Sequence, residues 1–237
     1  MSLLEEQNGP TRASVGQRLR AMGWRNDRLG AWAAEVEITQ EYGLGPGSLG
    51  VRALQEGAEQ RGPDLFVAGG YDLIPTRLLG GIDVRLSTPV TAVRAGRSGA
   101  TVTALDGTIL TADAVVIAVP VALLQREGLS VEPMTAPVRA AIGALRTGNL
   151  EKVVLRYETA WWDDLTVLGV IGGGVPGAPP GSPASLRWTE FYPLTEVLGF
   201  PALVGFCGGA AAMARPLAAS AIAAEAGDVL KAAFASG

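Results

Sequence analysis

The sequence has 237 residues, a formal net charge of −4 and no run of basic residues, so we expect no nucleic acid among its partners. It contains no histidine and a single cysteine, Cys207, which excludes a structural zinc site, an internal disulfide and any His-dependent nucleophile. No apolar stretch approaches the roughly 20 residues that span a bilayer, and the polar start is unlike a signal peptide. We therefore expect no membrane contact, and a lone cysteine makes the reducing cytoplasm the default location.

Helices are predicted throughout the first 65 residues. Ser14 and Gln17 have the spacing of a capping box, in which each side chain satisfies a free amide of the other residue. Gly43 is typical of a helix C-terminus. The predicted helical ranges are 15–24, 29–42 and 49 to about 62.

The sequence pattern changes at Leu65, from helical periodicity to short apolar runs. A short helix is predicted after Gly69-Gly70. Asp106-Gly107 between two alternating runs is a strong hairpin signal and indicates a β-meander. The apolar segment Ala114–Val119 is predicted to be a buried interior strand. The ranges are 71–79 for the helix and 82–86, 90–94, 100–105, 108–111 and 114–119 for the strands.

The last third of the sequence combines strands with two helices. The stretch 172–183, rich in Gly, Pro, Ala and Ser, is predicted to be a flexible excursion between strands. The other expected elements are a helix at 137–145, strands at 149–158, 185–192 and 202–206, and a closing helix from about 217. Because no regular βαβ alternation occurs, we predict an α+β or mixed fold.

The segment Gly45–Gly50 carries the letters of a dinucleotide-binding fingerprint. That fingerprint requires a preceding buried strand, whereas the residues before Gly45 are predicted to be helical. Pro46 also removes an amide donor that a phosphate could use. We interpret this segment as a loop between helices.

Lys152 is the candidate for chemistry, because it lies on the predicted strand 149–158 with Leu150 and Val154 on the same face. Two interpretations are open for a lysine between apolar neighbours. The strand is at the surface and the ammonium lies in water, or the lysine faces a lined cavity and serves a reaction.

A resemblance bears on that choice. The order of a Gly-Gly-Tyr helix, Thr88-Pro89-Val90, a three-stranded meander, the Val115–Pro120 stretch, the Lys152 strand and Trp162 resembles the flavin-containing amine oxidases, from about Ser14 to the C-terminus. The resemblance implies FAD as cofactor. It also implies a helical part of the substrate domain at 1–65, a partial FAD-binding domain with the meander and adjoining strand at 66–141, and a substrate domain with a sheet and closing helix at 142–237.

The resemblance assigns roles to single residues. Lys152 would lie near flavin N5 and hold a water there, as the catalytic residue. The residues expected at the cofactor are Val90, whose backbone would meet the adenosine end, and Ala118, Val119 and Pro120. No metal is expected.

Candidates for a substrate cavity are aromatic. Phe206 matches a cavity-lining position of the family, and Trp188 and Phe191 fall where such aromatics are often supplied. Core packing is the alternative for each, because large aromatics bury much area whatever their function. Glu190 and Glu196 either recognise a substrate charge or lie in solvent, the commoner case for acidic residues.

The resemblance implies oxidation of an amine or amino acid to an imine, with hydride transfer to flavin and formation of peroxide. We do not find the dinucleotide-binding turn or the closing flavin-covering segment of such enzymes within the 237 residues. We therefore expect an expressed fragment, a subunit of a split enzyme or a proteolytic remnant, inactive until partner segments complete the FAD site. Exposed apolar surface should then drive homo-oligomerisation. The alternative is a non-catalytic ligand-binding or interaction domain of the same ancestry.

Overall fold

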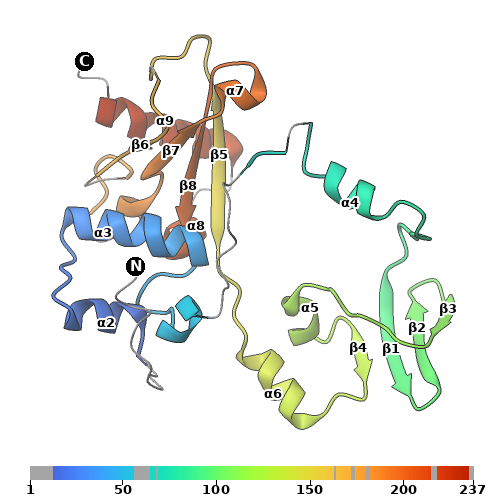
Figure 1. Cartoon of the computed structure of the whole chain (residues 1–237). Coiled ribbons are helices and arrows are strands. Elements are labelled where there is room, and N and C mark those ends of the chain that lie inside the picture. Colours follow the sequence, from blue (N-terminus) through green and yellow to red (C-terminus); the bar gives the residue numbers. More distant parts are fainter. Residues whose placement is uncertain are drawn as a thin grey trace. The chain divides into compact units, whose positions relative to one another are not determined.

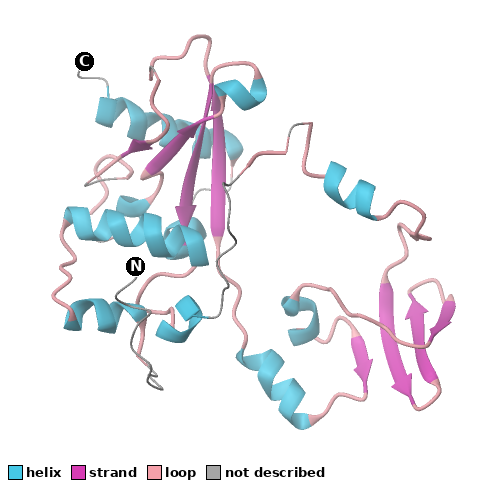
Figure 2. Cartoon of the chain, viewed as in Figure 1, coloured by secondary structure: helices cyan, strands magenta, loops and turns pink. Residues whose placement is uncertain are grey.

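The computed structural model describes residues 13–55, 65–67, 69–162, 164–171, 174–179, 182–214 and 218–234. The chain divides into two compact units, one formed by residues 1–66 with 148–237 and the other by residues 67–147. Figure 1 shows the path of the chain, and Figure 2 shows that both units contain helices and strands. The predicted mixture of helices and sheets is confirmed.

The first unit begins with helices, as predicted. They are α2 (Val15–Ala21), α3 (Arg28–Ala34), the π-helix η1 (Glu35–Gln40) and the 3₁₀ helix η2 (Val51–Gln55). The capping box at the start of α2 is present, since the Ser14 hydroxyl accepts from the Gln17 amide and the Ser14 amide donates to the Gln17 side chain. The predicted third helix is a 3₁₀ helix where it is described, and its expected continuation to about residue 62 lies outside the described residues.

The segment Gly45–Gly50 is a turn that follows helical residues and precedes η2. No strand leads into it, so its interpretation as a loop between helices is confirmed. The residues around it form a small core of Val15, Ile38, Leu49, Val51 and Leu54. This cluster holds the helices together by apolar burial.

The later part of the first unit contains a four-stranded antiparallel sheet. Its strands are β5 (Leu150–Arg156), β6 (Leu168–Gly169), β7 (Glu190–Pro193) and β8 (Ala202–Gly208), in the order β5-β8-β7-β6. The predicted strand at 185–192 is only partly correct. Its first half is the 3₁₀ helix η3 (Pro183–Leu186) and a turn in which Trp188 has a φ of 54°, outside the strand region.

One face of this sheet is covered by helices α8 (Gly209–Met213) and α9 (Ala219–Phe234) (Figure 1). The main core of the unit lies between them and the sheet. Gly205 permits the close packing, because a Cβ at this position would lie 2.5 Å from the Phe191 ring. The buried residues of this cluster include Val153, Trp162, Phe191, Leu203, Cys207, Ala226 and Val229.

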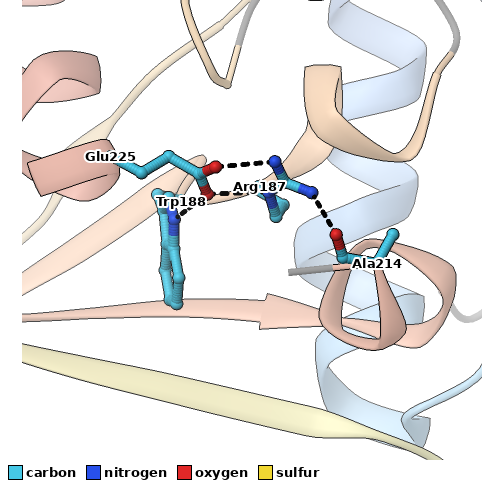
Figure 3. A network of polar contacts seen from close by, with 4 residues as sticks. All are labelled: Arg187, Trp188, Ala214 and Glu225. Carbon is cyan, nitrogen blue, oxygen red and sulfur yellow. Dashed lines mark hydrogen bonds and ion pairs between the residues drawn. The ribbon is translucent and has the colours of Figure 1, made fainter. Parts of the chain in front are cut away.

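A buried ion pair ties α9 to the turn before β7 (Figure 3). Arg187 donates to both carboxylate oxygens of Glu225, at 2.7 and 2.6 Å, and the Trp188 indole N–H donates to the same carboxylate at 2.8 Å. Arg187 also donates to the carbonyl of Ala214, at 2.9 Å. The network satisfies the charges that burial would otherwise leave unpaired, and it fixes where β7 begins.

The second unit contains the predicted meander. Strands β1 (Val90–Gly96), β2 (Gly99–Ala104) and β3 (Ile109–Ala112) are antiparallel neighbours, and β4 (Ser130–Glu132) pairs with β1 in parallel. Its helices are α4 (Leu73–Leu78), α5 (Val121–Gln125) and α6 (Ala136–Ala144). The three-residue strand β4 was not predicted, because so short a run carries no periodicity.

Two strand predictions in this unit are wrong. Residues 82–86 and 114–119 contain no strand. The first segment is exposed, with Leu86 at 82%, and the second, predicted to be buried, alternates between exposed and half-buried residues, with Val116 at 92% exposure. An extended segment becomes a strand only when a neighbour pairs with its backbone, and neither segment has such a neighbour among the described residues. The unit therefore presents apolar side chains at its surface, as the sequence led us to expect.

Candidate functional site

Lys152 lies in the middle of β5, and its side chain is exposed. Strand alternation places Leu150 and Val154 on the same face, and each of them is 51% exposed. Val153, on the opposite face, is buried in the main core. The lysine thus stands on the half-uncovered, apolar face of the sheet.

Three strands bring three side chains into one row on this face. Lys152 of β5 pairs with Phe206 of β8, and Phe206 pairs with Glu190 of β7. Neighbouring strands lie about 4.8 Å apart, so paired residues on one face are direct neighbours. A cation, an aromatic ring and a carboxylate are therefore lined up across the sheet.

Glu190 is buried, at 6% exposure, despite its charge. Its carboxylate accepts a hydrogen bond from the Tyr192 hydroxyl at 2.7 Å, and the Tyr192 ring meets Phe206 edge-to-face at 6.1 Å. Burial raises the pKa of Glu190, and the charge of Glu37 from η1 raises it further. Burial also raises the pKa of Tyr192, so its hydroxyl stays protonated and donates its hydrogen bond to Glu190.

The C-terminal end of β8 is held by a second buried acid. Glu35 of η1 accepts from the Gly208 amide at 2.9 Å and is 3% exposed. Burial raises its pKa from 4.5 to about 7, although the bond from Gly208 opposes the shift. A Cβ at Gly208 would lie 2.6 Å from the Thr39 carbonyl oxygen, so η1 packs directly on the strand end.

The aromatic candidates are divided between the two faces of the sheet. Phe206 lies beside Lys152, whereas Trp188 and Phe191 are fully buried in the main core on the other face. Their positions favour the packing alternative, because strand alternation turns Phe191 away from Glu190 and the Trp188 indole is engaged by Glu225. Cys207 is buried on the core face, where burial raises its pKa to about 12, so it is an inert thiol.

The residues expected at the cofactor belong to the second unit. Val90 begins β1 and is 39% exposed. Ala118 and Pro120 are exposed and Val119 is half-buried, in an extended segment without strand pairing. Extended backbone and exposed apolar side chains suit contact with the edge of a large ring system or an adenosine. These residues fit the FAD that the resemblance implies, and so does Lys152 on its apolar strand face.

The described part of the first unit contains a hollow of about 890 Å³ and another of about 300 Å³. Neither is lined by Lys152, Phe206 or Glu190. Over the same part of the chain, no group of His, Cys, Asp and Glu side chains could hold a metal ion. None of the described helices combines the length and the apolarity that a membrane span requires.

Sequence reasoning left Glu190 open between substrate recognition and solvent exposure, and it did not assign Tyr192 to the site. Their signal was the alternation within residues 190–193, which puts both on the face opposite to Phe191. The register that sets Glu190 beside Phe206 is a long-range property, and no local pattern reveals it.

Comparison with known proteins extends these observations. The family model described as flavin containing amine oxidoreductase matches residues 12–236. Polyamine oxidase 4 of Oryza sativa subsp. japonica is 32% identical over 65% of this chain and 30% of its own length. Probable polyamine oxidase 4 of Arabidopsis thaliana is 25% identical over 88% of this chain and 38% of its own length.

Solved structures show the same architecture. Wild-type putrescine oxidase bound to putrescine superposes with a TM-score of 0.68 and 24% identity, over 92% of this chain and 50% of that chain. This likeness establishes the fold. The chain thus spans well under half the length of these two curated relatives and half of the solved neighbour.

Proposed function

The chain belongs to the family of flavin-containing amine oxidoreductases, and on that premise we propose that it forms part of an enzyme that oxidises an amine to an imine. The unit of residues 1–66 and 148–237 is the substrate-binding part. The unit of residues 67–147 is a portion of the FAD-binding part. The segments that complete the FAD site come from elsewhere in the complete protein or from a partner.

The observation that carries this proposal is the row of Lys152, Phe206 and Glu190 on one face of the sheet. An exposed lysine between half-exposed Leu150 and Val154 is poorly explained as packing, because a covered face would bury them and a solvent face would be polar. A flat apolar ring system laid on this face would bury the leucine and the valine and leave the ammonium at its edge. FAD supplies the redox chemistry, since its isoalloxazine ring accepts hydride from the carbon next to the amine nitrogen.

Lys152 is the proposed catalytic residue. Its ammonium offers three donors on a flexible stem, so it can hold a water at the edge of the ring. Such a water would serve hydrolysis of the imine, or would assist reoxidation of the cofactor when FAD is bound. Phe206 supplies an apolar surface beside it and excludes bulk solvent from the amine.

Glu190 and Tyr192 are proposed to orient a cationic group of the substrate. A buried carboxylate attracts an ammonium more strongly than an exposed one, because less water screens the charge. Glu37 adds to this negative potential, as its effect on the pKa of Glu190 indicates. A second amino group on the substrate would satisfy the carboxylate, so we propose di- and polyamines as the first substrates to test.

In the second unit, Val90 and the segment Ala118–Pro120 are proposed contacts of FAD. The backbone of Ala118 and Val119 joins no strand among the described residues, so it can pair with the cofactor, whereas the Pro120 carbonyl is engaged by the Leu123 amide at 2.9 Å. The exposed apolar side chains around them, including Leu86 and Val116, are proposed to be covered by the segments that complete the site or by a second copy of the chain.

The test supplies the missing parts. A protein that contains this chain together with its complete FAD site is incubated with putrescine, spermidine and benzylamine, and peroxide formation and flavin bleaching are followed. We expect anaerobic bleaching of the flavin absorption band by at least one of these amines. A complete protein that binds FAD but is not bleached by any amine would favour the non-catalytic ligand-binding alternative. The chain alone is expected to be colourless.

A further inference from the structure

The smaller hollow of the first unit lies among its N-terminal helices. Its volume is about 300 Å³, at the lower end of the range of small-molecule sites. Its wall is drawn from residues 16–47, a stretch that the structure describes without a gap, and from Leu186 of η3. The polar and aromatic members of the wall are Arg20, Trp24, Asn26, Glu35 and Thr39.

Glu35 is a buried acid in this wall without a cationic partner. It is 3% exposed, and it forms no ion pair with any residue that the structure describes. The Gly208 amide donates to its Oε1 at 2.9 Å, and the Thr39 hydroxyl also interacts with the carboxylate. A carboxylate has about four acceptor sites, so Glu35 keeps capacity for another donor. An unpaired buried charge is costly, and a cation that enters the hollow would offset that cost.

Arg20 supplies the opposite charge at the rim of the same hollow. It is exposed, and its guanidinium pairs with no acid in the described part of the chain. Gly47 is also exposed in the wall, and its backbone amide donates to no group of the described residues. A guanidinium and a free amide are donors that suit a carboxylate. The hollow therefore offers a buried anion and, at its rim, a cation with a further donor.

We propose that the smaller hollow binds a free α-amino acid, with the ammonium on Glu35 and the carboxylate on Arg20 and the Gly47 amide. A simple amine would leave Arg20 unpaired and bring a second cation close to it, and a simple acid would meet the charge of Glu35. The half-buried Trp24 and Leu186 provide apolar surface for the side chain of the ligand. Binding here does not depend on the proposed amine oxidation, because Lys152, Phe206 and Glu190 do not line this hollow.

The test is titration of the 237-residue chain with L-norleucine at pH 8, followed by calorimetry and by tryptophan fluorescence. Pentylamine and hexanoate are the matched probes, because each lacks one of the two charged groups of norleucine. We expect saturable binding of norleucine and at least tenfold weaker binding of both analogues. Norleucine that does not saturate by either readout, or pentylamine that binds as tightly, would overturn the proposal. Because no flavin takes part, that result would leave the proposed oxidase function untouched.

Two variants and two controls locate the site. Glu35→Gln keeps an acceptor for the Gly208 amide and removes the charge, so it should weaken norleucine binding about 10- to 100-fold. Arg20→Gln changes an exposed side chain and should weaken binding about two- to fivefold. Glu41→Gln and Arg52→Gln are the matched controls, since both residues are exposed and line neither of the two hollows. Wild-type affinity in Glu35→Gln would contradict the site, and circular dichroism checks that each variant folds.

A pH series separates ligand binding by Glu35 from a merely structural role. Burial raises the pKa of Glu35 to about 7, so its carboxyl is mostly neutral at pH 5.5 and mostly charged at pH 8. Its neighbour Cys207 has a pKa raised to about 12 and stays neutral over this range, and Arg20 stays charged. The affinity for norleucine should therefore fall about tenfold or more from pH 8 to pH 5.5 in wild type and stay level in Glu35→Gln. The same pH profile in both proteins would contradict contact between Glu35 and the ammonium.

Discussion

Lys152 on β5 lies directly opposite Phe206 on β8, on a face of the sheet whose neighbouring apolar side chains are half exposed. The opposite face of the same two strands is covered by helices and forms the main core. The Lys152 face is buried around Val204 and Glu190, but along β5 it presents half-exposed apolar side chains that a further layer could cover. The proposal that a flavin and an amine meet on this face rests on that asymmetry.

Glu190→Gln should weaken recognition of diamines in the complete enzyme. The change keeps an acceptor for Tyr192 and removes the negative charge that faces the substrate. We expect KM for putrescine to rise about 10- to 100-fold with a smaller change in kcat, since a charged hydrogen bond is lost from substrate binding. Glu196→Gln, on an exposed residue of α7 (Thr195–Leu198), is the control and should leave KM unchanged. An unaltered KM in Glu190→Gln would remove Glu190 from the substrate site.

Glu35→Gln should change how stability depends on pH. Burial raises the pKa of Glu35 from 4.5 to about 7, so the folded chain holds this proton more tightly than the unfolded chain does. The contribution of Glu35 to the free energy of unfolding is therefore most favourable at low pH, and it falls as the pH rises from about 4.5 to 7. Above pH 7 the folded protein is less stable than at pH 4 by about 3 kcal/mol because of this group.

Urea unfolding at pH 5 and pH 8 measures this contribution. The glutamine keeps an acceptor for Gly208 and has no charge to bury, so the variant should be more stable than wild type at pH 8 and similar to it at pH 5. Parallel pH profiles for the two proteins would show that the carboxyl does not titrate as burial implies.

Glu225→Ala should destabilise the first unit strongly. It leaves Arg187 buried and unpaired and also frees the Trp188 indole, so we expect a loss of about 3–5 kcal/mol in the free energy of unfolding. The matched control is Asp228→Ala on the same helix, whose pair with Lys231 is exposed and whose loss should cost less than about 0.5 kcal/mol. Equal losses of stability for the two substitutions in thermal unfolding would show that the contacts of Glu225 with Arg187 and Trp188 do not hold α9 in place.

Gly205→Ala tests the packing of β8 against Phe191. The added Cβ would lie 2.5 Å from the ring, so the ring or the strand must move, at a cost of about 1–3 kcal/mol. Combination with Phe191→Leu should recover part of that loss. Gly227→Ala on α9 meets no neighbour within 4 Å and should raise stability by about 0.5–1 kcal/mol. The free energy of unfolding of the three variants is measured by chemical denaturation. An unchanged value for Gly205→Ala would mean that β8 or the Phe191 ring shifts without cost.

Elements with a local signal were predictable from the sequence. The capping box at Ser14 and Gln17, the turn at Asp106-Gly107 and the strand of Lys152 each carry their cause within a few residues. The prediction of a buried strand at Ala114–Val119 was wrong, because the apolar, β-branched composition of this segment is that of an interior strand. Composition does not supply a pairing partner, and none lies beside this segment among the described residues.

The candidate site was predictable only in part, for a similar reason. Lys152 was found from its apolar flanks and from the resemblance, both of which are visible in one stretch of sequence. The position of Glu190 depends on the register of β7 with β8, and its raised pKa depends in part on Glu37 of η1, more than 150 residues earlier in the chain. Trp188 and Phe191 were expected at a substrate cavity, with core packing as the alternative, and they lie in the main core. Residue type could not separate the two, because large aromatics line cavities and cores alike.

The most direct measurement is the rate of reoxidation of reduced flavin by oxygen in the complete enzyme, compared between wild type and Lys152→Met. The chain contains one other lysine, Lys231, exposed on α9 and paired with Asp228, so Lys231→Met is a matched control. We predict at least tenfold slower reoxidation or turnover for Lys152→Met, with unchanged folding and FAD content, and wild-type rates for Lys231→Met. Wild-type rates in Lys152→Met would contradict the assignment of this strand face to the flavin.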